Sequence, residues 1–260
     1  MMNIPAVSVH AFYTFLLVMA RVGGMMLAAP LLGNRSVPQT VKLGLTFVFT
    51  LALVPLVEPK AGPVPTHLLL LAFCVLKDGL FGLALGFVAR ILFTAVEMAG
   101  YFVDTQMGFG FANLVDPFSE QQSSVLSVFQ FQLATTIFLL MNGHLMLLGG
   151  VVDSYGTVPA GMVSPQGLFG MSIVPLVKTM FVLGFRLALP AAGVLVVVDM
   201  AFGLVARMVP QMNVFMVGMP AKIIIGLATV ALLLPILSLI VGQVLTGTEV
   251  GMHTLLSGVK

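Results

Sequence analysis

Long apolar runs separated by short polar stretches make up most of the chain. Residues 223–248 contain no charged side chain, and between Glu120 and Asp153 the only titratable side chain is that of His144. A hydrocarbon core about 30 Å thick is crossed by roughly 20 apolar residues in a helix, so both runs are long enough to span it. The pattern predicts about six hydrophobic helical segments, near residues 9–32, 43–57, 68–103, 122–152, 168–206 and 223–248.

Composition strengthens this interpretation. Charged residues make up 8% of the 260 residues and hydrophobic residues 59%, whereas a soluble domain carries about a quarter of its residues as charge. We therefore expect an all-α membrane protein. Because no polar stretch is long enough to fold separately, residues 1–260 are expected to form a single integral membrane domain. The net charge of +2 is small and dispersed, which argues against a nucleic-acid partner and leaves membrane lipids as the surroundings.

Several predicted segments contain helix-breaking residues. Prolines lie in or at the ends of apolar runs at Pro55, Pro175, Pro190, Pro220 and Pro235, and Gly82 and Gly86 have the GxxxG spacing that permits close helix approach. The run 43–57 is short, while 68–103 and 168–206 are long enough to be broken or paired helices. Segment 104–120 is acidic, yet a simple six-span count places it on the same side as the basic segments 33–42 and 207–222. Either 68–103 is a helical hairpin bent near Lys77–Asp78, or the simple alternation of sides fails. Irregular backbone at membrane depth survives only when buried in protein or lining an aqueous cavity. We therefore expect kinked or hairpin-like helices packed in a helical hetero-oligomer.

Charged residues inside the apolar runs lead to the same expectation. At a bilayer centre each costs roughly 2.5–3.5 kcal/mol or more, and the set is Arg21, Arg90, Glu97, Lys178, Arg186 and Asp199. Arg90, Glu97 and Asp104 are seven apart and lie near one helix face. One interpretation is a proton or ion relay. The favoured one is structural, with Arg90 paired to Glu97 or to a partner subunit, so that Arg21, Arg90 and Glu97 serve assembly.

Two stretches depart from the plain helical pattern. The segment Met107–Pro117 has turn residues at Gly108, Gly110, Asn113 and Asp116–Pro117, yet it is otherwise apolar. Such a loop either seals a pore or forms a hydrophobic turn packed on neighbouring helices. In Pro210–Pro220, a helix would place Met212, Met216 and Met219 on one adaptable face. The plainer interpretation of that methionine face is ordinary apolar packing.

No enzymatic motif is present in the sequence. There is no Walker A sequence, no HExxH, and the only cysteine, Cys74, lies in an apolar run. His144 could serve an intramembrane acyltransferase, but such a histidine normally needs a polar or acidic partner nearby. A hydrogen-bonded structural histidine is the favoured interpretation. We therefore expect a protein that is not an enzyme and binds no cofactor or metal.

The unusual stretches together resemble the FliR family of flagellar export-gate proteins and its relatives in virulence type III secretion. The resemblance covers essentially the whole chain, because the motifs follow one another in the family's order. They are RVGGMMLAAPLLGNRSVP (21–38), GFVAR (86–90), EMAG (97–100), QMGFGFANLVDP (106–117), NGHL (142–145) and PQMNVFMVGMP (210–220).

The resemblance implies a non-enzymatic subunit of the flagellar type III export gate in the bacterial inner membrane, within the flagellar basal body. FliP and FliQ would be its channel partners, FlhB and FlhA would associate, and unfolded flagellar export substrates would pass through. It also implies that much of the assembly is raised out of the usual bilayer plane. By the same resemblance, a pore plug is formed by Met107, Gly108, Phe109, Gly110, Phe111, Ala112, Asn113, Leu114, Val115, Asp116 and Pro117.

The alternative function is a small-solute secondary transporter or channel, suggested by the broken helices and the stripe of Arg90, Glu97 and Asp104. Transporters commonly contain internal repeats with matching interruptions in their two halves. Residues 1–120 and 140–260 show no convincing match of this kind. The absence of a repeat favours the export gate.

Overall fold

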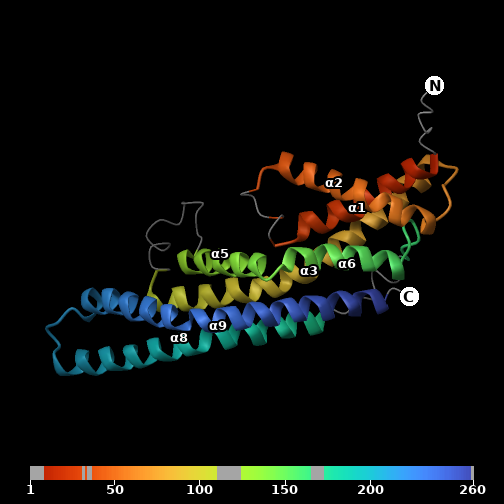
Figure 1. Ribbon diagram of the computed structural model, residues 1–260. Helices are drawn as coiled ribbons and strands as arrows, with labels where there is room; N and C mark the ends of the chain where they lie inside the picture. The colour runs from red at the N-terminus through yellow and green to blue at the C-terminus, as the bar shows by residue number, and fades with distance from the viewer. Residues whose placement is uncertain (1–8, 31–32, 34–36, 110–123, 165–172, 259–260) are drawn as a thin grey trace. The chain divides into compact units, whose positions relative to one another are not determined.

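The computed structural model describes residues 9–30, 33, 37–109, 124–164 and 173–258. Within these ranges the chain forms seven α-helices, one short 3₁₀ helix and no strand (Figure 1). The elements are α1 (Val9–Ala28), α2 (Gln39–Val57), η1 (Glu58–Lys60), α3 (Leu68–Met107), α5 (Val125–Leu140), α6 (Gly143–Thr157), α8 (Val174–Met208) and α9 (Val214–Gly258). The expected all-α class is confirmed.

Five of the described helices are long and apolar enough to cross a membrane, and α5 with α6 makes a sixth if that broken pair counts as one span. The protein is therefore an all-α membrane protein with about the number of hydrophobic segments that its apolar runs predict. The expected run 122–152 is interrupted at Asn142, which has a left-handed backbone (φ 58°) at the start of α6.

The lengths of several segments were predicted wrongly. The run predicted as short belongs to a span that, with η1, covers Gln39–Lys60. The two runs that are long enough to be broken or paired helices are each one helix, of 40 residues in α3 and 35 in α8, so the hairpin alternative at Lys77–Asp78 is wrong. The last helix extends well beyond 223–248 in both directions. The predicted bounds lie next to the charged residues Lys222 and Glu249, because the apolar run stops there. The backbone hydrogen bonds of a helix, however, continue past an isolated charged side chain.

The prolines do not end these helices. Pro55 lies inside α2, Pro190 inside α8, and Pro220 and Pro235 inside α9, while Pro175 is the second residue of α8. Each internal proline removes one backbone donor from its helix. In membrane helices this loss is tolerated where neighbouring groups satisfy the freed carbonyl.

The described chain divides into two compact units, each made from non-contiguous segments. Unit 1 contains 1–90, 142–176 and 246–260, and unit 2 contains 91–141 and 177–245. No single cut of the sequence separates them, because α3 and α9 each contribute residues to both.

Unit 1 is built around a close contact between α1 and the first half of α3. A Cβ atom at Gly82 would overlap the carbonyl oxygen of Arg21, one at Gly86 would overlap that of Met25, and one at Gly24 would overlap that of Gly79. Only a residue without a side chain permits backbones to approach so closely. The close helix approach expected from the GxxxG spacing of Gly82 and Gly86 is confirmed.

Unit 2 packs the second half of α3 against α5, α8 and the first half of α9. A Cβ at Gly100 would overlap the backbone of Ser127 in α5, and one at Gly184 of α8 would overlap the Met98 side chain of α3. The ring of Phe93 meets those of Phe131 and Phe138 edge to face, with centroids 6.1 and 5.1 Å apart. Close backbone contact and aromatic packing thus hold α3 at the centre of this unit.

Candidate functional site: a cleft at the end of α3

Helix α3 ends in a glycine-terminated turn. Gly108 has φ +93°, a left-handed conformation that glycine adopts without a Cβ penalty. Its N–H donates to the carbonyl of Thr105 at 3.2 Å, and the N–H of Phe109 donates to the carbonyl of Asp104 at 3.2 Å. This pair of bonds is the Schellman arrangement, which satisfies two of the last carbonyls of a helix. The chain leaves α3 in a direction that this turn sets.

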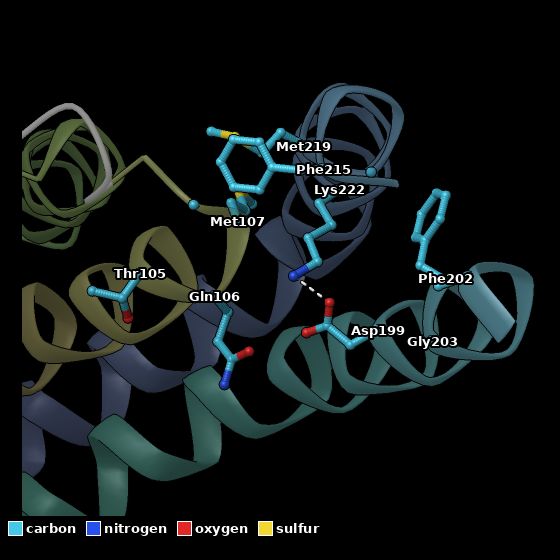
Figure 2. A pocket seen from close by; sticks show the side chains of 12 residues that line it. Thr105, Gln106, Met107, Asp199, Phe202, Gly203, Phe215, Met219 and Lys222 are labelled. Carbon is cyan, nitrogen blue, oxygen red and sulfur yellow. Dashed lines mark ion pairs between the residues drawn. The ribbon is translucent and has the colours of Figure 1, made fainter. Parts of the chain in front are cut away.

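A cleft of about 410 Å³ lies beside that turn, within unit 2 (Figure 2). Residues from the end of α3, from α8 and from α9 line it: Thr105, Gln106, Met107, Gly108, Asp199, Phe202, Gly203, Ala206, Phe215, Gly218, Met219 and Lys222. The α8 residues and the α9 residues both follow the spacing i, i+3, i+4, i+7. Each helix therefore presents one continuous face to the cleft.

The cleft combines one ion pair with apolar walls. Lys222 Nζ of α9 contacts Asp199 Oδ1 of α8, and the two side chains are 23% and 42% exposed (Figure 2). On the walls, a Cβ at Gly218 of α9 would make ordinary van der Waals contact with the Phe202 ring of α8, 3.8 Å away. The pair is open to solvent on one side, so the attraction it adds is modest.

A second polar site, the Arg21 cluster, lies in the core of unit 1. It consists of Arg21, Asp78, Ser154, Val158 and Gly161. The Arg21 guanidinium donates to Asp78 Oδ1 from Nε (2.8 Å) and Nη2 (2.5 Å), and from Nη1 to Ser154 Oγ (3.0 Å) and the Val158 carbonyl (2.9 Å). The Gly161 N–H donates to Asp78 Oδ2 at 2.8 Å.

The Arg21 cluster excludes solvent completely at its ion pair. Both side chains of the pair are 0% exposed, and the guanidinium carbon lies 4.9 Å from the Phe81 ring centroid and 4.2 Å from that of Tyr155. A buried pair is favourable only when hydrogen bonds satisfy the remaining donors and acceptors. Here four N–H donations and one backbone amide do so, and the rings cover the cation.

Comparisons with known proteins identify the family of the chain. Residues 12–248 match the family described as bacterial export proteins, family 1. The chain belongs to this family. It is 34% identical to the flagellar biosynthetic protein FliR of Bacillus subtilis over 255 residues, which cover 96% of each chain. It is 35% identical to the protein of that name from Escherichia coli, over 84% of this chain and 83% of the relative. For the Caulobacter vibrioides protein the identity is 32%, over 85% and 88%.

Part of the loop expected in this export protein lies in the described structure. Met107 is buried, and a Cβ at Gly226 of α9 would overlap its side chain. Gly108 lies near Met219, and Phe109 closes the Schellman turn. The remaining loop residues lie outside the described residues: Gly110, Phe111, Ala112, Asn113, Leu114, Val115, Asp116 and Pro117. The two unusual stretches of the sequence thus meet where α3 ends.

The expected methionine face in Pro210–Pro220 is only partly formed. Met212 lies in the turn before α9, which begins at Val214, so the three methionines do not share one helical face. Asn213 precedes the helix, and its Oδ1 accepts from the Met216 N–H at 3.3 Å. A side chain that caps the helix start places Met212 outside it. Met219 lines the cleft and Met216 is exposed.

The three charged residues of the stripe on α3, Arg90, Glu97 and Asp104, do not act as one group. Asp104 is buried and its Oδ1 accepts from the Leu126 N–H at 3.2 Å, at the start of α5. There Ser124 Oγ also accepts from the Ser127 N–H at 3.0 Å, so the two side chains together cap this helix. Arg90 and Glu97 are each half-buried and have interaction partners. Their assembly role stays a prediction.

Arg21 donates hydrogen bonds to Asp78, Ser154 and Val158 of its own unit, and its assembly role stays a prediction. Sequence reasoning missed Asp78, its counter-ion, because the two residues are 57 positions apart. A usable signal does exist. Arg21 precedes Gly24 closely and Asp78 is followed by Gly79 and Gly82, so small residues mark both helices next to the charge.

The expectation of a hydrogen-bonded structural His144 is not met at its Nδ1. That atom is buried and has no hydrogen-bond partner among the described residues. Across those same ranges, no group of three His, Cys, Asp or Glu side chains is placed to hold a metal ion. The site geometry therefore consists of a cleft, a helix-ending turn and ion pairs.

Proposed function

We propose that this chain is a non-enzymatic core subunit of the flagellar type III protein export gate, in the bacterial inner membrane at the flagellar basal body. The observation that carries the proposal is the match to bacterial export proteins over residues 12–248. Similarity over 96% of both chains to a relative named flagellar biosynthetic protein FliR supports the flagellar assignment.

The proposed partners are FliP and FliQ in the channel, with FlhB and FlhA associated and unfolded flagellar substrates in transit. Helix dimensions support a large assembly. At about 1.5 Å per residue, the 40 residues of α3 extend for about 60 Å, twice the thickness of a hydrocarbon core. Large apolar side chains such as Leu204, Met216 and Leu232 are at least 64% exposed. Neighbouring subunits would cover them, and Arg90 and Glu97 would take part in that packing.

The loop Met107–Pro117 is proposed as the plug of the resting channel. Two features support this proposal. The loop is largely apolar in composition, and it starts at a Schellman turn beside a cleft whose lining includes Met107, Phe215 and Met219. Phe109, Phe111 and Leu114 would exclude water from a narrow passage, and such dewetting closes pores to ions. Gly108 and Gly110 would allow the loop to change direction.

Deleting Gly108–Val115 tests the plug. We expect the chain to assemble while the membrane becomes permeable to small ions, measured as loss of membrane potential in cells expressing the full gate. A matched control replaces Phe109, Phe111 and Leu114 by methionine, which keeps the loop apolar and should keep the membrane tight. A deletion variant that remains tight and exports normally would remove the plug from the proposal.

The alternative of small-solute transport is tested separately. Replacing Glu97 with Gln should abolish proton-coupled uptake in a transporter, whereas the gate predicts at most an assembly defect. Purification in mild detergent followed by mass measurement distinguishes the two further. A large particle with two other small hydrophobic chains supports the gate, and a monodisperse monomer or homodimer contradicts it.

A further inference from the structure

Most acidic side chains in the described structure have an interaction partner. Of the nine Asp and Glu residues in the sequence, Asp116 and Glu120 lie outside the described ranges. Five of the others are partnered: Glu58 with His10, Asp78 with Arg21, Asp104 with the Leu126 N–H, Asp199 with Lys222, and Glu97 through a contact of its own. The remaining two, Asp153 and Glu249, have no hydrogen bond or ion pair to any described residue.

These two carboxylates line the same groove. It lies in unit 1 between α6 and the last turns of α9, has a volume of about 190 Å³, and has His253 on its wall. Met146, Met252 and Leu256 supply apolar surface between the charges. Two like charges facing one groove repel each other, and a cation placed between them removes that repulsion. Both carboxylates are exposed to solvent, so the groove offers a positively charged group two accessible acceptors beside an apolar wall.

Two neighbouring glycines of α6, Gly149 and Gly150, differ in the space beside them. A Cβ at Gly149 would have nothing within 4 Å, whereas one at Gly150 would lie 2.5 Å from the Met252 sulfur. A side chain at Gly150 would therefore require the Met252 side chain to move, whereas one at Gly149 would enter free space. The groove volume of about 190 Å³ is larger than that of several water molecules, each of which occupies about 30 Å³. The groove can therefore hold a long side chain.

We propose that this α6–α9 groove binds a lysine or arginine side chain of a neighbouring polypeptide in the assembled gate. The inference rests on the proposed heteromeric assembly and extends it to a specific contact surface. Apolar walls suit the aliphatic stem of such a side chain while its head meets the carboxylates. An arginine fork can donate to both acids at once. A hydrated inorganic cation would gain nothing from the methionine and leucine walls.

The first test neutralises the groove without changing its shape. The double variant Asp153→Asn with Glu249→Gln, expressed with its partner subunits, should lower the amount of tagged chain in the heteromeric particle about tenfold or more, because the partner's charge then lacks its counter-ions. Quantitative native gels of detergent extracts measure the change. The conservative pair Asp153→Glu with Glu249→Asp should retain the particle. Equal membrane levels of all variants establish that the chain itself folds and inserts.

A steric variant tests the same groove with its charges intact. Gly149→Leu fills the open space and should also remove the chain from the particle. Gly156→Leu is the matched control, since it lies on the same helix, has nothing within 4 Å of its Cβ position, and does not line the groove. It should assemble normally. Assembly of both leucine variants at wild-type level would overturn the proposal.

Reversing the charges identifies the partner side chain. Asp153→Lys with Glu249→Lys should block motility, and selection for restored swimming should return Asp or Glu in place of a lysine or arginine of one partner.

Loss of the particle in Lys260→Ala would overturn the proposal by naming the chain's own C-terminal lysine as the occupant. Dissociation of the wild-type particle by a chelator would overturn it in favour of a metal cation. If the neutral variant assembles fully while the wild type forms a heteromeric particle, only the groove is wrong. If the wild type forms no such particle, the proposed function itself fails.

Discussion

The Arg21 cluster and the cleft at the end of α3 each contain an ion pair between two helices, but the pairs differ in their surroundings. Arg21 and Asp78 are 0% exposed and have hydrogen bonds to a serine, a carbonyl and a backbone amide. Lys222 and Asp199 are 23% and 42% exposed, beside an open cleft. A sealed pair fixes one arrangement of helices, since removing either partner leaves a buried charge. A pair open to water leaves its helices free to adjust at little cost.

The largest expected effect comes from breaking the sealed pair. Arg21→Met keeps the apolar stem but leaves Asp78 buried without its counter-ion, so we expect a loss of about 3–5 kcal/mol in stability. Thermal unfolding in mild detergent, followed by helical circular dichroism, measures it. Adding Asp78→Asn to Arg21→Met should recover much of the loss, because the orphaned charge is then gone. A single variant as stable as the wild type would refute the structural role of the pair.

A smaller effect is expected from separating the helices that enclose it. Gly82→Ala places a methyl group on the Arg21 carbonyl, and relieving this overlap requires α1 and α3 to move apart. We expect a loss of about 1–3 kcal/mol, typical of overpacking. Gly44→Ala in α2 is the control, because its Cβ would meet nothing within 4 Å and alanine favours a helix. Equal unfolding temperatures for both variants would contradict the close approach.

The third prediction concerns the helix cap next to the cleft. Asp104→Ala removes an acceptor from the Leu126 N–H and should cost about 1 kcal/mol, the usual worth of a cap. Asp104→Asn keeps an acceptor oxygen and should cost less. Hydrogen exchange of the first-turn amides of α5 measures the local effect. Unchanged protection in the alanine variant would show that Ser124 alone caps the helix.

The smallest effect is expected for the open pair. Lys222→Gln should change stability by less than about 1 kcal/mol, since exposed pairs rarely contribute more. The same unfolding measurement places it on one scale with Arg21→Met. A loss as large as that of Arg21→Met would erase the contrast between the two regions.

Sequence patterns predicted the helical class and the approximate number of spans, because the bilayer requires long apolar helices. The contact at Gly82 and Gly86 was predictable for a similar reason, since their spacing alone determines that they share a face. Which residue each buried aspartate would contact was not predictable. Nothing local distinguishes Asp78, which meets Arg21, from Asp104, which caps a helix 22 residues away. Long-range pairing depends on which helices become neighbours, and hydropathy does not encode that. The prediction that Met212 shares a helical face with Met216 and Met219 was wrong, because Asn213 caps the start of α9 and Met212 precedes it.

The amide of Gly161 has a consequence for the order in which the chain is made. Asp78 receives that hydrogen bond from a residue 83 positions downstream. At 5–20 residues per second, a ribosome takes roughly 4–17 s to reach it after the aspartate has been synthesised. During that interval Arg21 is available to the carboxylate and the later amide is not. A nascent chain stalled before residue 161 should therefore hold its first three helices loosely, open to proteolysis, and tighten only when translation resumes.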